Sequence, residues 1–200
     1  TAAMNAVVLG ALGIRSLSDK RVLLFGSGGI ATETVKILAS ELGLKEVDVI
    51  NHSGDLSKIK NANSQGTVTI HGGSLDNISD YDVIICHTQS TAPVISKDYL
   101  DKVKNGAVIT SFISSTEHGE VADDFYDSRR ANIIVDWDKT VVGAKDMQRA
   151  QTAALFSDTE LIFIKDLLNS NSVDSSKQYT IYRSNGTPIQ NVAVLRELVP

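Results

Sequence analysis

Residues 21–42 have the sequence RVLLFGSGGIATETVKILASEL, and this stretch determines the class of fold. It begins with a short apolar run, typical of a buried β-strand, that stops at Gly26. After the glycines, apolar residues recur at the spacing of one helix face, at Ala31, Val35, Leu38 and Leu42. The order strand, glycine turn, helix predicts the first half of a parallel βαβ unit.

The turn itself has the pattern G-x-G-x-x-A, formed by Gly26, Ser27, Gly28, Gly29, Ile30 and Ala31. In this pattern Gly26 permits a tight turn, Gly28 lets the backbone approach a pyrophosphate, and Ala31 allows close helix packing. The helix N-terminus adds free N–H groups and a positive dipole. We therefore predict a dinucleotide site. S-adenosylmethionine is a competing ligand, because methyltransferase sheets also have a glycine-rich first turn, and a turn chosen only for packing is the structural alternative.

Further apolar runs predict the other strands. They lie at residues 46–53, near Ile70, and at 80–88, 106–114, 131–136 and 178–186. Most of them lack polar alternation, as a parallel sheet covered by helices on both faces requires. The sequence therefore predicts an α/β fold with a doubly wound parallel sheet and flanking helices.

Helical spacing predicts helices at residues 1–14, 97–104, 145–154, 158–168 and 189–198. From these elements we expect a linker helix at 1–17 and a dinucleotide-binding domain at 18–144. We expect C-terminal helices with a return strand at 145–200, so that the chain ends in a strand-helix return segment.

Composition narrows the class of protein. The 200 residues include 19 Lys+Arg and 24 Asp+Glu, a net charge of −5, which argues against nucleic acid as a partner. The sequence has no run of about 18 apolar residues and no basic segment before an apolar stretch at its start, so we expect a cytoplasmic protein without membrane partners. We find no metal-ligand spacing, P-loop or G-x-S-x-G motif, which disfavours metal, NTPase and hydrolase functions.

The end of the second predicted strand bears on the choice of cofactor. An NAD-selective site usually places a carboxylate there, but this chain has Asn51, His52 and Ser53, and Asp48 lies in mid-strand. Without a carboxylate to repel a 2′-phosphate, NADP is favoured, and NAD stays open.

The segment HTQSTAP, residues 87–93, follows the fourth predicted strand at the edge where such sheets bind ligands. We consider Thr88, Gln89 and Ser90 as cofactor contacts, although Ser and Thr before proline also form ordinary turns. His87 has no evident carboxylate partner, and we expect it to be a structural histidine with its hydrogen bonds satisfied.

The loop SSTEHGE, residues 114–120, follows the fifth predicted strand at the same edge. The loop contains the titratable residues Glu117, His118 and Glu120. Either Glu117 or His118 could transfer protons to a bound substrate. An exposed polar loop would have the same composition. The catalytic residues are therefore left unassigned, with Glu117 and His118 as the candidates.

Several segments together resemble the ornithine cyclodeaminase and mu-crystallin family, which also contains archaeal alanine dehydrogenases and ketimine reductases. They are the helix start Thr1-Ala2-Ala3, the glycine turn at 26–31, the Thr-x-Ser-x-x-Pro segment at 88–93 and TIYRSNGTPIQNVAV at 180–194. The last segment is the most specific. The resemblance covers nearly the whole chain.

The resemblance implies a Rossmann domain that binds NAD(H) or NADP(H) and passes hydride to or from the α-carbon of an amino acid or the matching imine. It implies that Thr88 and Ser90 contact the cofactor and that Ser184 lies near the nicotinamide. The segment 51–53 is similar to the Asn-Arg-Thr of the NADPH-using branch. Family members are homodimers with small amino-acid or imine substrates.

Two departures limit what the resemblance implies. The family's N-terminal substrate and dimerisation domain, with its catalytic lysine and substrate-binding arginines, is absent from these 200 residues, and we expect an incomplete active site. The cyclodeaminase branch has a catalytic Asp where this chain has Ser114-Ser115-Thr116.

We therefore expect the cofactor domain of an amino-acid dehydrogenase, imine reductase or cyclodeaminase-like oxidoreductase, and leave open whether this chain alone is an enzyme. A non-catalytic NADP(H)-binding protein of the crystallin type is the alternative. A methyltransferase is a third, weaker one.

Overall fold

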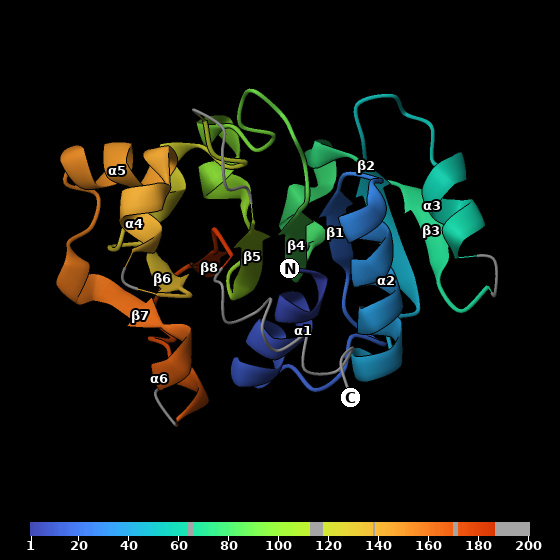
Figure 1. The fold of residues 1–200 in the computed structure, drawn as a ribbon, viewed down its shortest axis with the longest axis horizontal. Helices are drawn as coiled ribbons and strands as arrows, with labels where there is room; N and C mark the ends of the chain where they lie inside the picture. Colours follow the sequence, from blue (N-terminus) through green and yellow to red (C-terminus); the bar gives the residue numbers. More distant parts are fainter. Residues whose placement is uncertain (64–65, 113–117, 138, 170–171, 187–200) are drawn as a thin grey trace, which may run out of the picture.

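The computed structural model describes residues 1–63, 66–112, 118–137, 139–169 and 172–186. These residues form one sheet in which neighbouring strands pair in parallel, in the order β3-β2-β1-β4-β5-β8-β6-β7 (Figure 1). The strands are β1 (Val22–Phe25), β2 (Glu46–Ile50), β3 (Thr69–Gly72), β4 (Val83–Cys86), β5 (Ala107–Ser111), β6 (Ala131–Val135), β7 (Leu161–Phe163) and β8 (Tyr179–Arg183). The predicted doubly wound α/β fold is confirmed.

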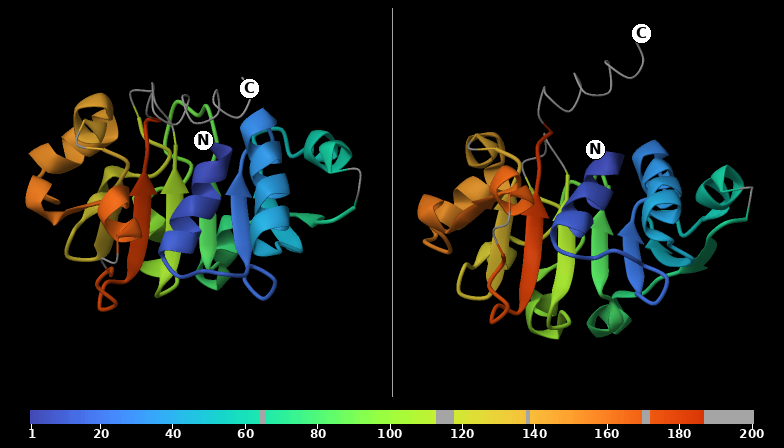
Figure 2. Two further views of the ribbon diagram at one scale, coloured as in Figure 1. Left: turned by 60° about the horizontal axis from the view of Figure 1, so that its bottom comes forward. Right: turned by 90° about the horizontal axis from the view of Figure 1, so that it is seen from below.

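Helices cover both faces of the sheet. One face is covered by α1 (Ala2–Ala11), α2 (Gly29–Leu42), α3 (Ser57–Ala62) and α6 (Ile164–Leu168), as Figure 2 shows for α1, α2 and α6. The other face packs against short 3-10 helices, η1 (Leu75–Asp80), η2 (Lys97–Lys102) and η3 (Asp123–Tyr126), and against α4 (Thr140–Gly143) and α5 (Lys145–Thr152). A further 3-10 turn, η4 (Asp158–Glu160), precedes β7.

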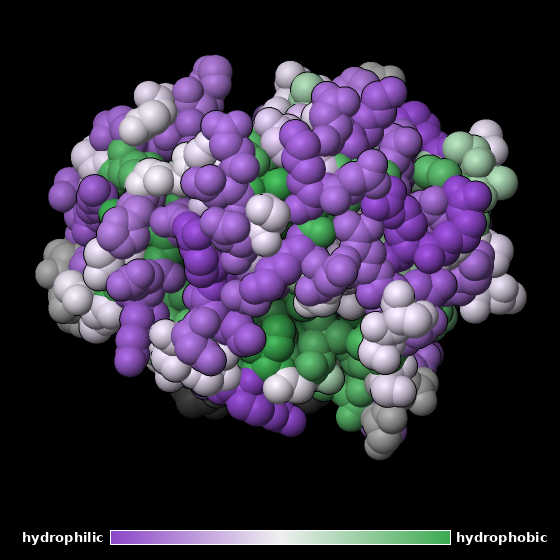
Figure 3. Space-filling model, turned by 180° about the vertical axis from the view of Figure 1, so that it is seen from behind, coloured by the Kyte–Doolittle hydropathy of each residue, from purple (hydrophilic) through white to green (hydrophobic). Residues whose placement is uncertain are grey.

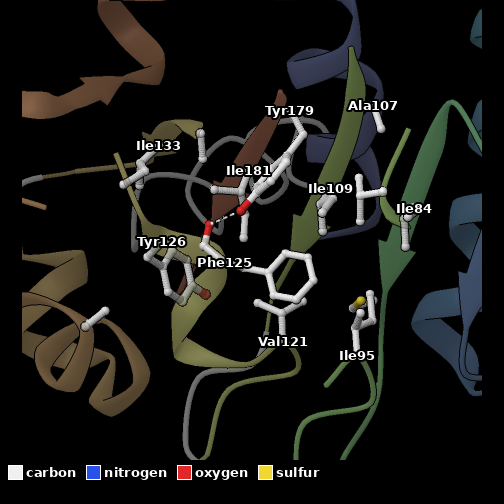
Figure 4. Packing of buried hydrophobic residues seen from close by; sticks show 14 of the residues in the cluster. Ile84, Ile95, Ala107, Ile109, Val121, Phe125, Tyr126, Ile133, Tyr179 and Ile181 are labelled. Atoms are coloured by element: carbon white, nitrogen blue, oxygen red, sulfur yellow. Dashed lines mark hydrogen bonds between the residues drawn. The ribbon is translucent and has the colours of Figure 1, made fainter. Parts of the chain in front are cut away.

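The continuous apolar strands supply two cores at once, because successive side chains of a strand point to opposite faces. In β1, Leu23 and Phe25 join the core on the 3-10 side, whereas Val22 and Leu24 join the core under α2. Figure 4 shows the first of these cores, where the Tyr179 hydroxyl donates a hydrogen bond to the carbonyl oxygen of Phe125 (3.1 Å). Both faces of the sheet are therefore buried in apolar cores, as the sequence pattern predicts.

The return strand β8 occupies the interior of the sheet. It pairs with β5 on one side and with β6 on the other, so that Thr180 is opposite both Val108 and Asn132. The described part of the segment 145–200 thus shares the sheet with the segment 18–144 through this strand and through β7, which pairs with β6. The predicted helix at 189–198 lies outside the described residues.

One predicted element is wrong. Residues 158–168 do not form a single helix but η4, the edge strand β7 and the short helix α6. β7 pairs with β6 along Ile133–Val135, so tertiary pairing overrides the helical spacing of this β-prone Leu-Ile-Phe run. The predicted helix at 97–104 is the shorter 3-10 helix η2, and the sequence analysis did not anticipate α3 and α4.

Candidate functional site

The glycine turn lies at the carboxyl end of β1, between β2 and β4, where successive connections of the sheet run in opposite directions. Gly26 has a φ of 103°, and its N–H donates to the carbonyl oxygen of Ile50 (2.8 Å). A Cβ atom on Gly26 would collide with the carbonyl oxygen of His87. Glycine is therefore required for the ends of β1, β2 and β4 to approach this closely.

Gly28 and Gly29 have a different role. Gly28 is the N-cap of α2 with ordinary φ, and a Cβ atom on either glycine would meet nothing within 4 Å. The first turn of α2 contains no acidic residue, so the N–H groups and the positive end of this 14-residue helix are uncompensated. Ala31, one turn further, is buried against the sheet. These features are those expected of the anion-binding cradle that the motif predicts.

An open cleft of about 370 Å³ lies in front of this cradle. Its walls come from the ends of β1, β4, β5 and β8. The residues that line it are Thr1, Gly28, Gly29, Ile30, Ala31, His87, Thr88, Gln89, Phe112, Glu120, Asn185 and Gly186.

The end of β2 is joined to the glycine turn. Asn51 Nδ2 donates to Ser27 Oγ (2.8 Å) and to the carbonyl oxygen of Asp55 (2.7 Å), whereas His52 and Ser53 are exposed. The Asp55 carboxylate accepts hydrogen bonds from the Ser57 N–H (2.8 Å) and hydroxyl (2.9 Å), which lower the pKa of Asp55. This carboxylate, which the sequence did not single out, thus bonds to the first residue of α3.

Asp48 takes no part in this arrangement. Its carboxylate accepts hydrogen bonds from the Tyr81 hydroxyl (2.8 Å) and the Arg21 guanidinium (2.9 Å). The prediction that a mid-strand Asp48 stays away from a ribose therefore agrees with its contacts.

Thr88, Gln89 and Ser90 follow β4, and the first two line the cleft. The Thr88 N–H and hydroxyl both donate to Glu120 Oε1 (2.6 and 3.1 Å). Ser90 Oγ donates to the carbonyl oxygen of Ala92 (2.6 Å), so this hydroxyl closes a local turn. Of the three candidates, the structure thus brings Thr88 and Gln89 to the cleft and uses Ser90 in the turn.

Glu120 is the carboxylate that the structure places in the cleft wall. It is 1% exposed, and its second oxygen accepts from the Ser111 hydroxyl (2.9 Å) and the Phe112 N–H (3.0 Å). Through these hydrogen bonds, Glu120 links the residue that follows β4 to the end of β5. Of the residues proposed for proton transfer, Glu117 lies outside the described residues, and His118 is exposed and does not line the cleft.

His87 is the structural histidine that the sequence predicts. Its Nε2 lies 3.1 Å from Asn5 Nδ2 and 3.0 Å from Thr34 Oγ1, which joins β4 to α1 and α2. Burial lowers the pKa of His87 to about 4, so the ring is neutral and Nε2 accepts the Asn5 hydrogen bond. The ring also packs against Phe112, with centroids 5.1 Å apart.

The turn after β8 forms the opposite wall. Ser184 is buried, its hydroxyl donates to Asp136 Oδ2 (2.6 Å), and its N–H donates to the carbonyl oxygen of Ser111 (3.0 Å). Asn185 and Gly186, not Ser184, line the cleft. The turn that the resemblance indicates therefore borders the cleft, through two residues that the sequence did not single out.

A buried ion pair supports this turn. Arg183 and Asp146 are both 2% exposed at the side chain, with Arg183 Nε 2.9 Å from Asp146 Oδ2. The Tyr126 hydroxyl also donates to Asp146 (2.9 Å), and Arg183 donates to the carbonyl oxygen of Ser184 (2.7 Å). Burial alone raises the pKa of Asp146, but the charge and hydrogen bonds of Arg183 outweigh it and the pKa is lowered. No sequence motif indicated this pair.

The part of the chain that the structure describes contains neither a metal-ligand cluster nor a membrane-spanning helix. No group of three His, Cys, Asp or Glu side chains there could hold a metal ion. No helix there is long and apolar enough to span a membrane.

Solved structures resemble nearly the whole chain. The probable ornithine cyclodeaminase of Bordetella pertussis Tohama I is 22% identical and covers 97% of this chain, with a TM-score of 0.81. The iminosuccinate reductase of Paracoccus denitrificans, solved with NAD+, is 21% identical and covers 99%, also with a TM-score of 0.81. The chain spans 62% and 61% of these two proteins. Identities this low show a shared fold, which is the fold that the ornithine cyclodeaminase resemblance implies.

A closer sequence relationship covers the first half of the chain. The shikimate dehydrogenase (NADP(+)) of Bacillus mycoides strain KBAB4 is 30% identical over 104 residues, which are 48% of this chain and 37% of that protein. The family model described as shikimate / quinate 5-dehydrogenase matches residues 9–113, more than half of the chain and the part that contains the glycine turn and β1 to β5. By this match the chain belongs to the shikimate / quinate 5-dehydrogenase family.

Proposed function

We propose that this chain binds a nicotinamide dinucleotide, with its pyrophosphate at the N-terminus of α2. The observation that supports this most strongly is the open space over Gly28 and Gly29, which a Cβ atom would begin to fill, beside the uncompensated end of a long helix. The position of the cleft at the switch point of the sheet agrees with it. The family model and the NAD+ complex of the Paracoccus reductase provide further support.

Within this proposal the adenosine half lies at the end of β2 and the nicotinamide half at the ends of β5 and β8. NADP is the preferred cofactor, because His52 and Ser53 are exposed hydrogen-bond donors at the end of β2. The carboxylate of Asp55 beside them already accepts two hydrogen bonds from Ser57. Replacing Ser53 with Asp should shift the preference toward NAD through repulsion of the 2′-phosphate. An unchanged ratio of NADPH to NADH affinity would contradict the NADP assignment.

The bound cofactor would supply hydride transfer at the α-carbon of an amino acid or its imine. This chemistry is implied by the family resemblance and agrees with the iminosuccinate reductase and the archaeal alanine dehydrogenase among the similar structures. In the described part of the cleft, this chain's residues bind and orient: α2 offers its N–H groups, and Glu120 fixes the wall beside Thr88. A homodimer is part of the proposal, as in the archaeal alanine dehydrogenase dimer.

A second candidate is cofactor binding without turnover. The two titratable side chains that line the described cleft favour this candidate, because both already make hydrogen bonds within the chain. His87 contacts Asn5 and Thr34, and Glu120 accepts four hydrogen bonds. Oxidation of NADPH in the presence of pyruvate or a cyclic imine separates the two candidates, because only the oxidoreductase changes the absorbance of the reduced nicotinamide.

Fluorescence titration with NADPH and NADH tests the shared claim. We expect saturable binding by the unaltered chain and its loss in Gly28→Val, because the branched side chain fills the space over the cradle. Gly72→Val is the matched control, since a Cβ atom at this strand-end glycine also meets nothing within 4 Å but lies outside the cleft lining. Saturable binding of S-adenosylmethionine instead would favour a methyltransferase.

A further inference from the structure

Asn185 lines the cleft, and its amide has an acceptor that no described residue uses. Its Nδ2 donates to the carbonyl oxygen of Thr140 (3.0 Å). Because a carbonyl oxygen can only accept, this bond fixes which end of the amide is nitrogen. The other end, Oδ1, is buried and has no hydrogen-bond partner among the residues that the structure describes. A buried acceptor of this kind needs a donor, and Asn185 lines the cleft from which a ligand would supply it.

The neighbouring helix leaves room for this amide. Gly143 ends α4, and a Cβ atom there would lie 2.7 Å from Asn185 Nδ2. The φ of Gly143 is outside the left-handed region, so its backbone conformation does not require glycine. The missing side chain instead provides the space in which the Asn185 amide lies.

The position of Asn185 indicates which part of the ligand it faces. It follows β8, next to β5, whereas Asn51 and Ser53 follow β2 on the other side of the glycine turn. A dinucleotide lies across the switch point with one half on each side. With adenosine at β2, the β8 side faces the nicotinamide, whose carboxamide group has two N–H donors.

We propose that Asn185 Oδ1 accepts a hydrogen bond from the carboxamide of a bound nicotinamide ring. This inference rests on the proposed dinucleotide site and makes Asn185 a residue that selects and orients the nicotinamide. The space beside Gly143 and the hydrogen bond to the carbonyl oxygen of Thr140 fix the position of the Asn185 amide, and with it the acceptor Oδ1.

The test compares NADPH with its reduced 3-acetylpyridine analogue, in which a methyl group replaces the carboxamide nitrogen. The unaltered 200-residue chain should bind NADPH about tenfold more tightly than the analogue, the value of one net hydrogen bond. Asn185→Leu has a similar shape without the acceptor, and it should abolish this preference by weakening NADPH alone. Asn105→Leu, at an exposed asparagine before β5 on the opposite edge of the sheet, should keep it.

Gly143→Ala is a second variant that does not touch the ligand. Its methyl group displaces the Asn185 amide at an exposed helical position, so it should reduce the preference while thermal unfolding followed by circular dichroism shows an intact fold. Equal affinities of the unaltered chain for NADPH and the analogue would overturn the carboxamide contact, as would equal weakening of both ligands by the variants. No binding of either ligand by the unaltered chain would instead contradict the proposed function.

Discussion

At the scale of single residues, the glycine turn contains two kinds of glycine. Gly26 is needed for the fold, because its φ is 103° and a side chain would collide with backbone. We propose that Gly28 serves the ligand, because its φ is ordinary and the space beside it is open. The two positions therefore separate stability from binding.

Gly26→Ala should lower the free energy of unfolding by about 2 to 3 kcal/mol, since a left-handed conformation and a backbone collision act together. Gly28→Ala should leave the free energy of unfolding unchanged within about 0.5 kcal/mol and weaken NADPH binding. Urea denaturation and fluorescence titration of both variants check this pair. Equal losses of stability in the two variants would show that the turn is not built as described.

His87 makes stability depend on pH. Its pKa in the folded chain, about 4, lies below the unfolded value of 6.5, so the unfolded chain binds the extra proton between these values. This contribution of His87 to the free energy of unfolding is fully present above pH 6.5 and is lost as the pH falls toward 4, at a cost on the order of 3 kcal/mol. Urea unfolding at pH 7 and pH 4.5 should show this loss, and His87→Gln should reduce it. The matched variant His71→Gln, at an exposed histidine, should retain the loss.

The sequence allows the site to be predicted where the chemistry is local. The glycine pattern predicts the turn at the N-terminus of α2, and the isolated His87 is rightly expected to be structural. The sequence alone could not single out Glu120 and Asn185, because their roles depend on segments that meet only in the folded sheet. Glu120 joins β4 to β5, and Asn185 donates a hydrogen bond to the carbonyl oxygen of Thr140 at the start of α4.

At the scale of elements, β8 and α5 are joined by the buried Arg183–Asp146 pair. Asp146→Asn should lower the free energy of unfolding by about 3 to 5 kcal/mol, because it leaves the Arg183 charge buried without its counterion. The double variant Asp146→Leu, Arg183→Met should recover most of this loss. Urea denaturation of the unaltered chain and these two variants checks it, and a double variant no more stable than Asp146→Asn would contradict a coupled pair.

Element prediction failed where pairing, not local pattern, determines the conformation. The run Leu161-Ile162-Phe163 fits a helix by spacing, yet it forms an edge strand because β6 offers an unpaired edge. The strand at 179–183 was predicted, but its place between β5 and β6 depends on long-range pairing that apolar periodicity does not encode.

At the scale of the whole molecule, the two edges of the sheet differ. The carboxyl ends of the strands form the cleft, whereas the opposite edge, largely hydrophilic in Figure 3, contains exposed ion pairs between Arg21 and Asp80 and between Lys104 and Asp82. Exposed pairs of this kind contribute little to stability, at about 0 to 1 kcal/mol each. The proposed binding is therefore confined to one edge of the sheet.

Nuclear magnetic resonance of the isotopically labelled chain during addition of NADPH tests most directly the proposal that the cofactor binds at the glycine turn. The backbone amides of Gly28, Gly29 and Ile30 should shift in a saturable manner, because they form the N-terminus of α2, where we propose that the pyrophosphate binds. The amides beside Arg21 and Lys104, at the opposite edge, should not move. Saturable shifts at that edge with none at residues 28–30 would contradict the account.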